Sequence, residues 1–464
     1  MNKMGDSAEN DTTYDCIVIG AGYSGLAAAR LLKESDKKVL VLEARDRVGG
    51  RAKTIRLEKE GDYWDVGASF LGDQQDLMYG FAKEFDVTLF SPPADGKIVL
   101  AYRGKAHRYS GLIPPLRPWE VLDMGLFVRN FEKLCDTVNL EEPWKTPNAD
   151  ELDRITVHEW LKKQAWTQAT IDMGSLAFEG VIGQNTSCIS MLHAMFFWKG
   201  AVSFSSALSS DGGAQQHLVK GGGQLIAEKL RSYIGHDLIR LGEPVRAVSY
   251  TESVATIQTS KATYRARRII SAVPPPLVLK IDFEPRLPVE KITLLQNMPM
   301  GAYLKVFATY KTPFWREKGL TGESTNPTGF LNVTFDATPD PGCTPKLMGF
   351  ITGTKAREFT SLSNDQRRHV ALAGFASVFG QEALDPEEFF YHSMAEEEWA
   401  SGCPFATPAP RMWTSLGEWM RKPIGAIHWA GTETSTKHFG YMEGAVFAGQ
   451  RAAREVLEEL KWKI

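Results

Sequence analysis

A short apolar segment and the glycine-rich turn that follows it, close to the N-terminus, constrain the fold more than any other feature of the sequence. Residues 14–19 (YDCIVI) predict a buried strand, and residues 20–25 (GAGYSG) follow at once with the spacing G-x-G-x-x-G. Residues 24–34 then show helical spacing of apolar side chains, and residues 38–42 (KVLVL) predict a second buried strand. The chain is therefore predicted to begin with a βαβ unit, the start of a Rossmann-like parallel sheet of the α/β class.

Each glycine of this turn has a different predicted role in binding a dinucleotide. Gly20 permits the sharp turn after the strand, Gly22 lets the main chain approach a diphosphate, and Gly25 lets the helix pack closely on the strand. The helix N-terminus adds N–H donors and a partial positive charge. Glu43 ends the second strand, where a carboxylate can accept hydrogen bonds from both hydroxyls of a ribose. Because an acidic residue there disfavours a 2′-phosphate, NADP is not expected.

The composition excludes several other classes of protein. The chain has 464 residues, 43% of them apolar and 23% charged, which is typical of globular proteins rather than disordered, collagen-like or small disulfide-rich ones. Its 53 Lys and Arg residues nearly balance 56 Asp and Glu residues, so no basic excess favours binding to nucleic acid. Five cysteines without Cys-x-x-Cys spacing predict neither a disulfide framework nor a metal site. They are Cys16, Cys135, Cys188, Cys343 and Cys403.

The apolar segments and the ends of the chain indicate where the protein is expected to reside. No run approaches the roughly 18 apolar residues of a membrane span. Residues 1–13 are polar and acidic, which predicts a flexible tail rather than a secretory signal. The final residues, KWKI, are not a peroxisomal address of the SKL type. A cytoplasmic homodimer is expected, with a peroxisomal location left open.

Beyond the βαβ unit the hydrophobic periodicity changes twice. Four helical stretches come first, at residues 119–138, 156–164, 168–182 and 190–201. Strands then alternate across residues 237–272 and return at residues 301–310 and 347–352, before a terminal helix at residues 441–461. The βαβ unit and the terminal strand and helix are expected to form one discontinuous domain. The helices and late strands between them would form a second, α+β domain.

Residues 43–51 (EARDRVGGR) continue directly from the second strand and point to one dinucleotide. Gly49 and Gly50 allow a second close approach of the main chain, and the Arg51 guanidinium suits phosphate or flavin ring oxygens. After a G-x-G-x-x-G turn, this run resembles the FAD-binding signature of the flavin-containing amine oxidases. Five later segments are similar to blocks of that family: residues 64–72 (WDVGASFLG), 221–224 (GGGQ), 271–275 (SAVPP), 430–434 (AGTET) and 440–445 (GYMEGA).

Within this family the chain is most similar to the monoamine oxidases, especially the soluble fungal ones. The resemblance implies a monoamine oxidase-like fold, with a Rossmann-like FAD-binding domain and a discontinuous substrate-binding domain. The FAD-binding domain would comprise residues 14–85, 215–290 and 395–464. The substrate-binding domain would comprise residues 86–214 and 291–394.

The resemblance also implies the reaction. The expected enzyme is an FAD-dependent oxidase of primary amines, which passes the equivalent of a hydride from the amine α-carbon to flavin N5. With O₂ and water, the products are an aldehyde or ketone, ammonia and H₂O₂. A polyamine oxidase would need acidic residues along a tunnel, and an L-amino-acid oxidase would need an arginine for the substrate carboxylate. These two alternatives stay open, as does a flavin-bound interaction module without activity.

The family's cofactor contacts carry over to residues that match its motifs. Those implied to bind FAD are Gly20, Gly22, Ser24, Gly25, Glu43, Arg45, Gly50, Arg51, Ala68, Ser69, Val245, Cys403, Thr434 and Met442. Ala68 and Ser69 would lie beside the isoalloxazine, and the main chain of Val245 would hold the adenine. Thr434 and Met442 would lie near the flavin pyrimidine ring, where N–H groups of the terminal helix would stabilise negative charge on reduced flavin.

Three residues are implied to act on the substrate: Lys305, Tyr441 and Gln215. Lys305 lies in the otherwise apolar residues 301–306, where a lysine is costly to bury without a partner or a function. It matches the family lysine that holds a water against flavin N5, and the alternative is a strand-edge lysine that points to solvent. Gln215 matches an active-site glutamine. For Glu443, a helix-start role and a direct flavin contact both stay open.

Two neighbouring residues leave the linkage of the flavin and the shape of the substrate pocket open. Cys403 matches the cysteine that mammalian monoamine oxidases bond to the flavin 8α-methyl, but its surroundings differ, and some fungal relatives lack it. A covalent thioether and a free packing thiol are both open readings. Pro404 replaces one of two aromatic rings that stand perpendicular to the flavin in the family, whereas Tyr441 supplies the other. Unless Phe405 or a more distant aromatic fills the gap, the pocket should accept bulky or long-chain amines.

Overall fold

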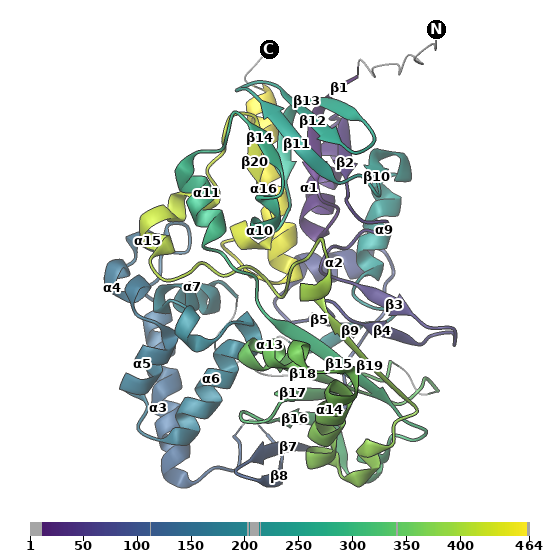
Figure 1. Cartoon of the computed structure of the whole chain (residues 1–464), viewed down its shortest axis with the longest axis vertical. Helices are drawn as coiled ribbons and strands as arrows, with labels where there is room; N and C mark the ends of the chain where they lie inside the picture. Colours follow the sequence, from purple (N-terminus) through teal and green to yellow (C-terminus); the bar gives the residue numbers. More distant parts are fainter. Residues whose placement is uncertain are drawn as a thin grey trace.

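The computed structural model describes residues 12–111, 113–201, 204, 213, 215–339 and 342–461. The expected N-terminal tail up to Asp11 and the final three residues therefore lie outside the described residues. Two large sheets occupy opposite ends of the molecule, with a group of helices beside one of them (Figure 1).

The first sheet confirms the predicted βαβ unit. Its strands are, in spatial order, β10 (Ile239–Arg240), β2 (Val39–Leu42), β1 (Thr13–Ile19), β13 (Thr263–Ser271), β12 (Ala255–Thr259), β11 (Val245–Tyr250) and β14 (Asp282–Glu284), and β20 (Ile427–Trp429) also pairs with β13. β1 is parallel to β2 and to β13, and β11, β12 and β13 form the predicted antiparallel meander. Because β20 is parallel to β13, the C-terminal strand joins the sheet of the N-terminal strand, as expected.

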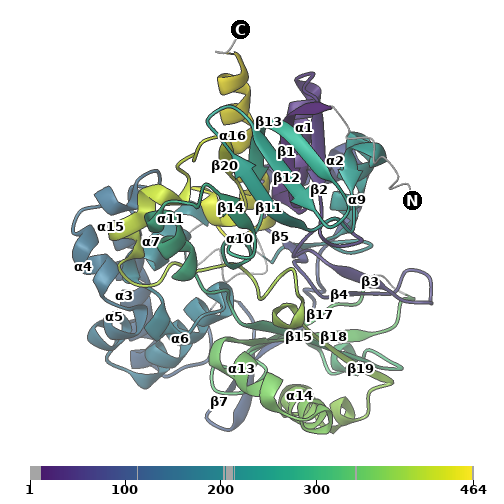
Figure 2. The same ribbon diagram turned by 45° about the horizontal axis from the view of Figure 1, so that its top comes forward.

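Helices cover both faces of this sheet. One face carries α1 (Tyr23–Glu34), α9 (Leu225–Ile234) and α16 (Met442–Lys461), with α2 (Asp76–Glu84) beside them, and their apolar side chains share one buried core. The other face carries α10 (Pro275–Val278) and α11 (Val289–Gln296). α1 and α16 lie side by side in both views (Figures 1 and 2). They approach so closely that a Cβ at Gly449 would lie 2.0 Å from the Ser24 carbonyl oxygen.

The second sheet is mostly antiparallel and contains the late strands predicted from the sequence. Its order is β19 (Glu388–Ser393), β15 (Tyr303–Thr309), β18 (Lys346–Thr352), β17 (Val333–Asp336), β16 (Leu320–Thr325), β7 (Lys97–Tyr102) and β8 (Lys105–Tyr109). Two small sheets complete the strands, β3 (Thr54–Arg56) with β4 (Tyr63–Asp65), and β5 (Phe70–Leu71) with β9 (His217–Val219) and β6 (Leu89–Phe90). α12 (Phe314–Glu317), α13 (Gly353–Ser361) and α14 (Asn364–Phe379) pack on the large sheet.

The helical region beside the second sheet contains all four helices predicted between residues 119 and 201. Its helices are α3 (Pro118–Cys135), α4 (Ala149–Arg154), α5 (Val157–Gln164), α6 (Gln168–Ile182) and α7 (Met191–Ala201), and α15 (Met412–Leu416) packs against them. Their core is strongly aromatic and includes the consecutive residues Phe196, Phe197 and Trp198 of α7. None of the described helices is both long and apolar enough to cross a bilayer.

We propose that the two large sheets belong to the two domains outlined from the sequence. Every strand of the first sheet falls within the ranges assigned to FAD binding, apart from Thr13, and every strand of the second falls within the substrate-binding ranges. The limit between residues 290 and 291, however, cuts through α11. Because α11 packs on the first sheet, we propose to place this limit after Gln296.

Candidate active site

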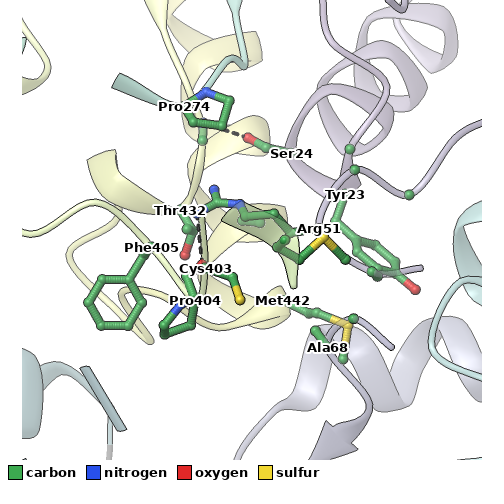
Figure 3. A pocket seen from close by; sticks show the side chains of 18 of the residues that line it. Tyr23, Ser24, Arg51, Ala68, Pro274, Cys403, Pro404, Phe405, Thr432 and Met442 are labelled. Carbon is green, nitrogen blue, oxygen red and sulfur yellow. Dashed lines mark hydrogen bonds between the residues drawn. The ribbon is translucent and has the colours of Figure 1, made fainter. Parts of the chain in front are cut away.

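A cavity with a volume of about 320 Å³ is lined by residues from both large sheets and from the segments that connect them. It brings together most of the residues singled out in the sequence: Gly20, Gly22, Ser24, Glu43, Arg45, Gly50, Arg51, Ala68, Ser69, Gln215, Val245, Lys305, Cys403, Tyr441 and Met442. Figure 3 shows Ser24, Arg51, Cys403 and Met442 gathered around it, although more than 400 residues separate the first from the last. Gly25 and Thr434 are not part of the lining.

The glycines of the turn have the geometry that a dinucleotide needs. Gly20 has φ +100°, which favours glycine, and a Cβ at Gly25 would lie 1.8 Å from the Gly20 carbonyl oxygen. Gly22 differs, because a Cβ there would meet only the Cα of Gly50, at 3.8 Å. The main chains at Gly22 and Gly50 thus line the cavity without side chains. We call this part of the cavity the glycine cradle. A side chain at either position would partly fill it, and its place beside the N-terminus of α1 suits a diphosphate.

Two polar side chains of the cradle are fixed by main-chain hydrogen bonds. Glu43 is buried, and its two oxygens accept from the N–H of Ala21 at 2.7 Å and of Arg45 at 2.9 Å. Each oxygen keeps acceptor capacity, so the carboxylate is oriented and still able to receive ribose hydroxyls. The Ser24 hydroxyl accepts from the Gly431 N–H at 2.8 Å, which ties the start of α1 to the segment after β20.

Glu397, which the sequence analysis did not identify, gathers four basic groups beside the cavity. Its carboxylate lies 2.7 Å from Lys53, 3.2 Å from Arg45 and 3.5 Å from Arg47, and His392 Nε2 lies 2.9 Å away. Burial alone would raise the pKa of Glu397, but the hydrogen bonds from His392 and Lys53 and the charge of Arg45 hold it well below its usual range. Lys53, Arg45 and Arg47 together carry more positive charge than the Glu397 carboxylate neutralises. The resulting positive wall beside the cavity suits an anionic cofactor.

Arg51 joins the FAD-signature loop to the segment that contains Cys403. Its guanidinium bonds both oxygens of Glu433, at 2.6 and 3.1 Å, and donates to the Pro404 carbonyl at 2.8 Å (Figure 3). Glu433 is 2% exposed and also accepts from the Ala406 N–H at 3.1 Å. A buried carboxylate of this kind depends on its partner, because removing the cation would leave an uncompensated charge. The position of Arg51 beside the cavity is therefore set by Glu433.

Lys305 points into the protein rather than to solvent. It is 6% exposed, and its ammonium donates to the carbonyls of Asp65 at 2.9 Å and Gly67 at 2.6 Å and to the Ser69 hydroxyl at 2.6 Å. Burial lowers its pKa to about 8, against the opposing effect of the Asp65 charge. All three donors of the ammonium have protein acceptors, so the contact to a water that the resemblance implies would require one of these bonds to open. That role stays a prediction.

The loop that Lys305 holds is anchored from behind as well. The buried Asp65 carboxylate accepts from the Thr54 hydroxyl at 2.9 Å and from the Gly223 N–H at 3.0 Å, and burial raises its pKa. Lys346, on β18, donates to the carbonyl of Tyr63 and is 1% exposed. Two buried lysines of the second sheet therefore hold β4 and the residues after it against the cavity. Neither Asp65 nor Lys346 was identified from the sequence, because their partners are distant along the chain.

One part of the cavity wall is aromatic. Tyr441 and Phe405 both stack on Phe197, with ring centroids 5.9 and 5.4 Å away and interplanar angles of 24° and 23°. Phe405 is only 1% exposed and also packs edge-on against Phe439. Phe405 therefore belongs both to the aromatic core and to the cavity lining, on which Pro404 also lies.

Four further residues singled out from the sequence have defined surroundings in the structure. Val245 and Met442 line the cavity, in line with their expected contacts. The hydroxyl of Thr434 donates to the Gly431 carbonyl at 3.0 Å and accepts from Arg451, so any contact of Thr434 with a flavin would come from its main chain. The Glu443 carboxylate accepts from the N–H groups of Leu77 and Met78 at the start of α2, at 3.0 and 2.9 Å, which favours the structural reading of this residue.

Cys403 lies on the cavity wall, where a thioether to a flavin would have to form. Its thiol donates to the Tyr303 carbonyl at 3.6 Å, and burial raises its pKa to about 12. Because the thiolate is the reactive form, we expect only part of the flavin to stay with acid-precipitated protein, with a larger part after incubation at alkaline pH. Cys403→Ala should release all of it. If the natural protein also releases all its flavin, Cys403 serves only packing.

Among the described residues, no three His, Cys, Asp or Glu side chains are placed to hold a metal ion. The motifs and the cradle favour a dinucleotide as the group that this cavity holds.

Comparisons with known proteins agree with this geometry. Residues 23–457 match the model of the family described as flavin containing amine oxidoreductase. AofH of Mycobacterium tuberculosis H37Rv, assigned as a flavin-containing monoamine oxidase, is 38% identical over 444 residues and covers 96% of both chains. Among solved structures, putrescine oxidase bound to putrescine superposes with a TM-score of 0.93, at 30% identity over 96% of this chain and 99% of that one. Cyclohexylamine oxidase from Brevibacterium oxydans gives 0.92, at 30% identity over 97% and 100%.

These matches span nearly the whole chain, and the family match at residues 23–457 includes most of the residues that line the cavity. The cradle at Gly22 and Gly50, the oriented Glu43 and the positive wall beside Arg45 fit the cofactor of that family. The chain belongs to the flavin-containing amine oxidoreductases, and it is an FAD-dependent amine oxidase.

Proposed function

We propose that this enzyme oxidises bulky or long-chain primary monoamines. The observation that carries the proposal is the large apolar and aromatic share of the cavity lining outside the glycine cradle, which includes Val181, Phe197, Tyr303, Phe350, Phe405 and Tyr441. Among the described residues of the lining, Glu43 is the only carboxylate, and it lies at the cradle. Apolar walls with no carboxylate besides Glu43 suit a substrate with one amino group and a hydrocarbon remainder.

The two rival substrate classes are disfavoured by the same lining. Putrescine oxidase, whose fold is similar, is by name an enzyme of a diamine, and a second ammonium would be costly to bury without a carboxylate. An amino acid would need a cation for its carboxylate. Arg51 is bonded to Glu433, however, and Lys305 has three protein acceptors. Cyclohexylamine oxidase, also similar in fold, is named for a bulky monoamine.

The residues that line the cavity would have different roles in the proposed reaction. When bound, FAD supplies the redox chemistry. Glu43, Arg45 and Arg51 would hold the cofactor, and the apolar walls would favour the neutral form of the amine, because burial disfavours its charged form. Lys305 would place a positive charge near the reacting end, and Tyr441 would orient the substrate.

The proposal includes a homodimer in the cytoplasm. Trp119, Leu122 and Leu126 share one face of α3 and are 51%, 58% and 43% exposed, and gathered apolar side chains of this kind favour association. The described cysteines are all unpaired, which suits a reducing compartment. Light scattering of the purified protein would give the mass of the assembly directly.

An anaerobic substrate panel tests the proposal. Benzylamine, cyclohexylamine and a long-chain alkylamine should each bleach the oxidised flavin, whereas putrescine, spermidine and leucine should be at least about tenfold slower, because an unpaired second charge is costly to bury. Faster bleaching by putrescine or leucine would contradict the proposed substrate class. Pro404→Tyr is a further check, since a second ring should shift the relative rates toward small flat amines.

A further inference from the structure

Tyr303 lines the cavity together with Tyr23 and Tyr441, and none of the sequence motifs assigned it a role. It begins β15, two residues before Lys305, and side chains two positions apart in a strand point to the same face. Lys305 reaches the loop at residues 65–69 from that face, and Tyr303 lies on the cavity lining with it. The ring of Tyr303 packs edge-on against Phe350, with centroids 5.2 Å apart, so its direction is fixed.

Tyr303 and Tyr441 both line the cavity. Cys403 donates to the Tyr303 carbonyl, which places this strand end beside the Cys403–Pro404 segment. Burial raises the pKa of the Tyr303 phenol far above its ordinary value, and the nearby Cys403 and Tyr441 add to the shift. Burial also raises the pKa of Tyr441. Both phenols therefore stay neutral across the pH range in which an enzyme works.

Neither hydroxyl has a hydrogen-bond partner within the described part of the chain. Other tyrosines of the interior do, since Tyr23 donates to the Gly223 carbonyl, Tyr63 to that of Val219 and Tyr310 to that of Ala383. A buried phenol normally finds a partner. Two neutral phenols without a protein partner, both on the cavity lining, offer two acceptors to a small polar group of a ligand.

We propose that Tyr303 and Tyr441 bind the amino group of the substrate as a pair, with each phenol oxygen accepting one N–H bond. The inference rests on the proposed function, and the two phenol oxygens would be the groups that favour primary amines over N-methylated ones. A primary amine offers two N–H bonds to two acceptors, an N-methyl amine offers one, and an N,N-dimethyl amine offers none. The ring of Tyr303 would also be the more distant aromatic that stands in for the one lacking at Pro404.

The test compares a primary amine with its N-methyl derivative in the FAD-loaded enzyme. Tyr303→Phe keeps the ring and removes one acceptor, so kcat/KM for the primary amine should fall by about tenfold, the effect of one hydrogen bond. The N-methyl amine, which can use Tyr441 alone, should lose less. The preference for the primary amine should therefore shrink, and Tyr441→Phe should shrink it in the same way.

Tyr310→Phe is the matched control, because Tyr310 directly follows β15 and donates to the Ala383 carbonyl away from the cavity. It should leave the preference unchanged. Equal losses for the two amines in Tyr303→Phe, at normal FAD content, would overturn the pairing while leaving the proposed function intact. If no primary monoamine reduces the flavin of the natural enzyme, the proposed function fails, and the pairing fails with it.

Discussion

Gly22→Ala is expected to give a folded protein that no longer retains FAD. Gly22 has φ −72° and ψ 176°, which any residue can adopt, and the added methyl would meet only the Cα of Gly50, at 3.8 Å. The protein itself therefore tolerates the change. The methyl would stand in the cradle through which a diphosphate approaches the main chain, so we expect FAD affinity to fall by about 100-fold or more. Flavin absorbance per chain after gel filtration measures the result.

Two further glycine variants separate loss of cofactor from loss of fold. Gly25→Ala would place a Cβ 1.8 Å from the Gly20 carbonyl oxygen, so this variant should be unstable even without FAD. Gly125→Ala, in α3, has no neighbour within 4 Å of its added Cβ and should keep full FAD content and stability. A Gly22→Ala protein with full FAD content would contradict the role given to this glycine, and one that melts like Gly25→Ala would show a structural one.

The features predicted correctly from the sequence are those encoded locally. The turn at residues 20–25 carries its own strand, helix and glycine spacing, so its geometry follows from a short segment. The helices between residues 119 and 201 follow from periodicity alone. The limit proposed at residue 290 cut through α11 because a resemblance of motifs does not locate the ends of helices.

The features that sequence analysis missed depend on contacts between distant segments. Glu397 meets Arg45 across 352 positions of the chain, and Lys305 meets Gly67 across 238. Nothing near Glu397 in the sequence distinguishes it from the adjacent Glu396 and Glu398. Tyr303 could have been noticed, because its spacing of two from Lys305 places both on one face of a strand.

Lys305→Met is expected to slow reoxidation of the flavin by O₂ more than its reduction by amine. The reaction with O₂ develops negative charge on oxygen, and a fixed cation in a dry cavity stabilises it, so its loss should cost about 100-fold. Amine oxidation has no such need of a cation, and its rate should fall less. Stopped-flow measurement of the two half-reactions gives both rates, and comparable losses would indicate a structural lysine.

The pH dependence of reoxidation sharpens this test. Burial lowers the pKa of Lys305 to about 8, so the side chain is cationic below that pH and neutral above it. Reoxidation of the natural enzyme should therefore be fast below about pH 8 and slow above it, whereas Lys305→Met should be slow throughout. Lys346→Met is the matched control, because burial also lowers the pKa of Lys346 to about 8, but Lys346 is not on the cavity lining. It should lose stability and keep the pH profile, since only a charge beside the reacting oxygen can change that profile.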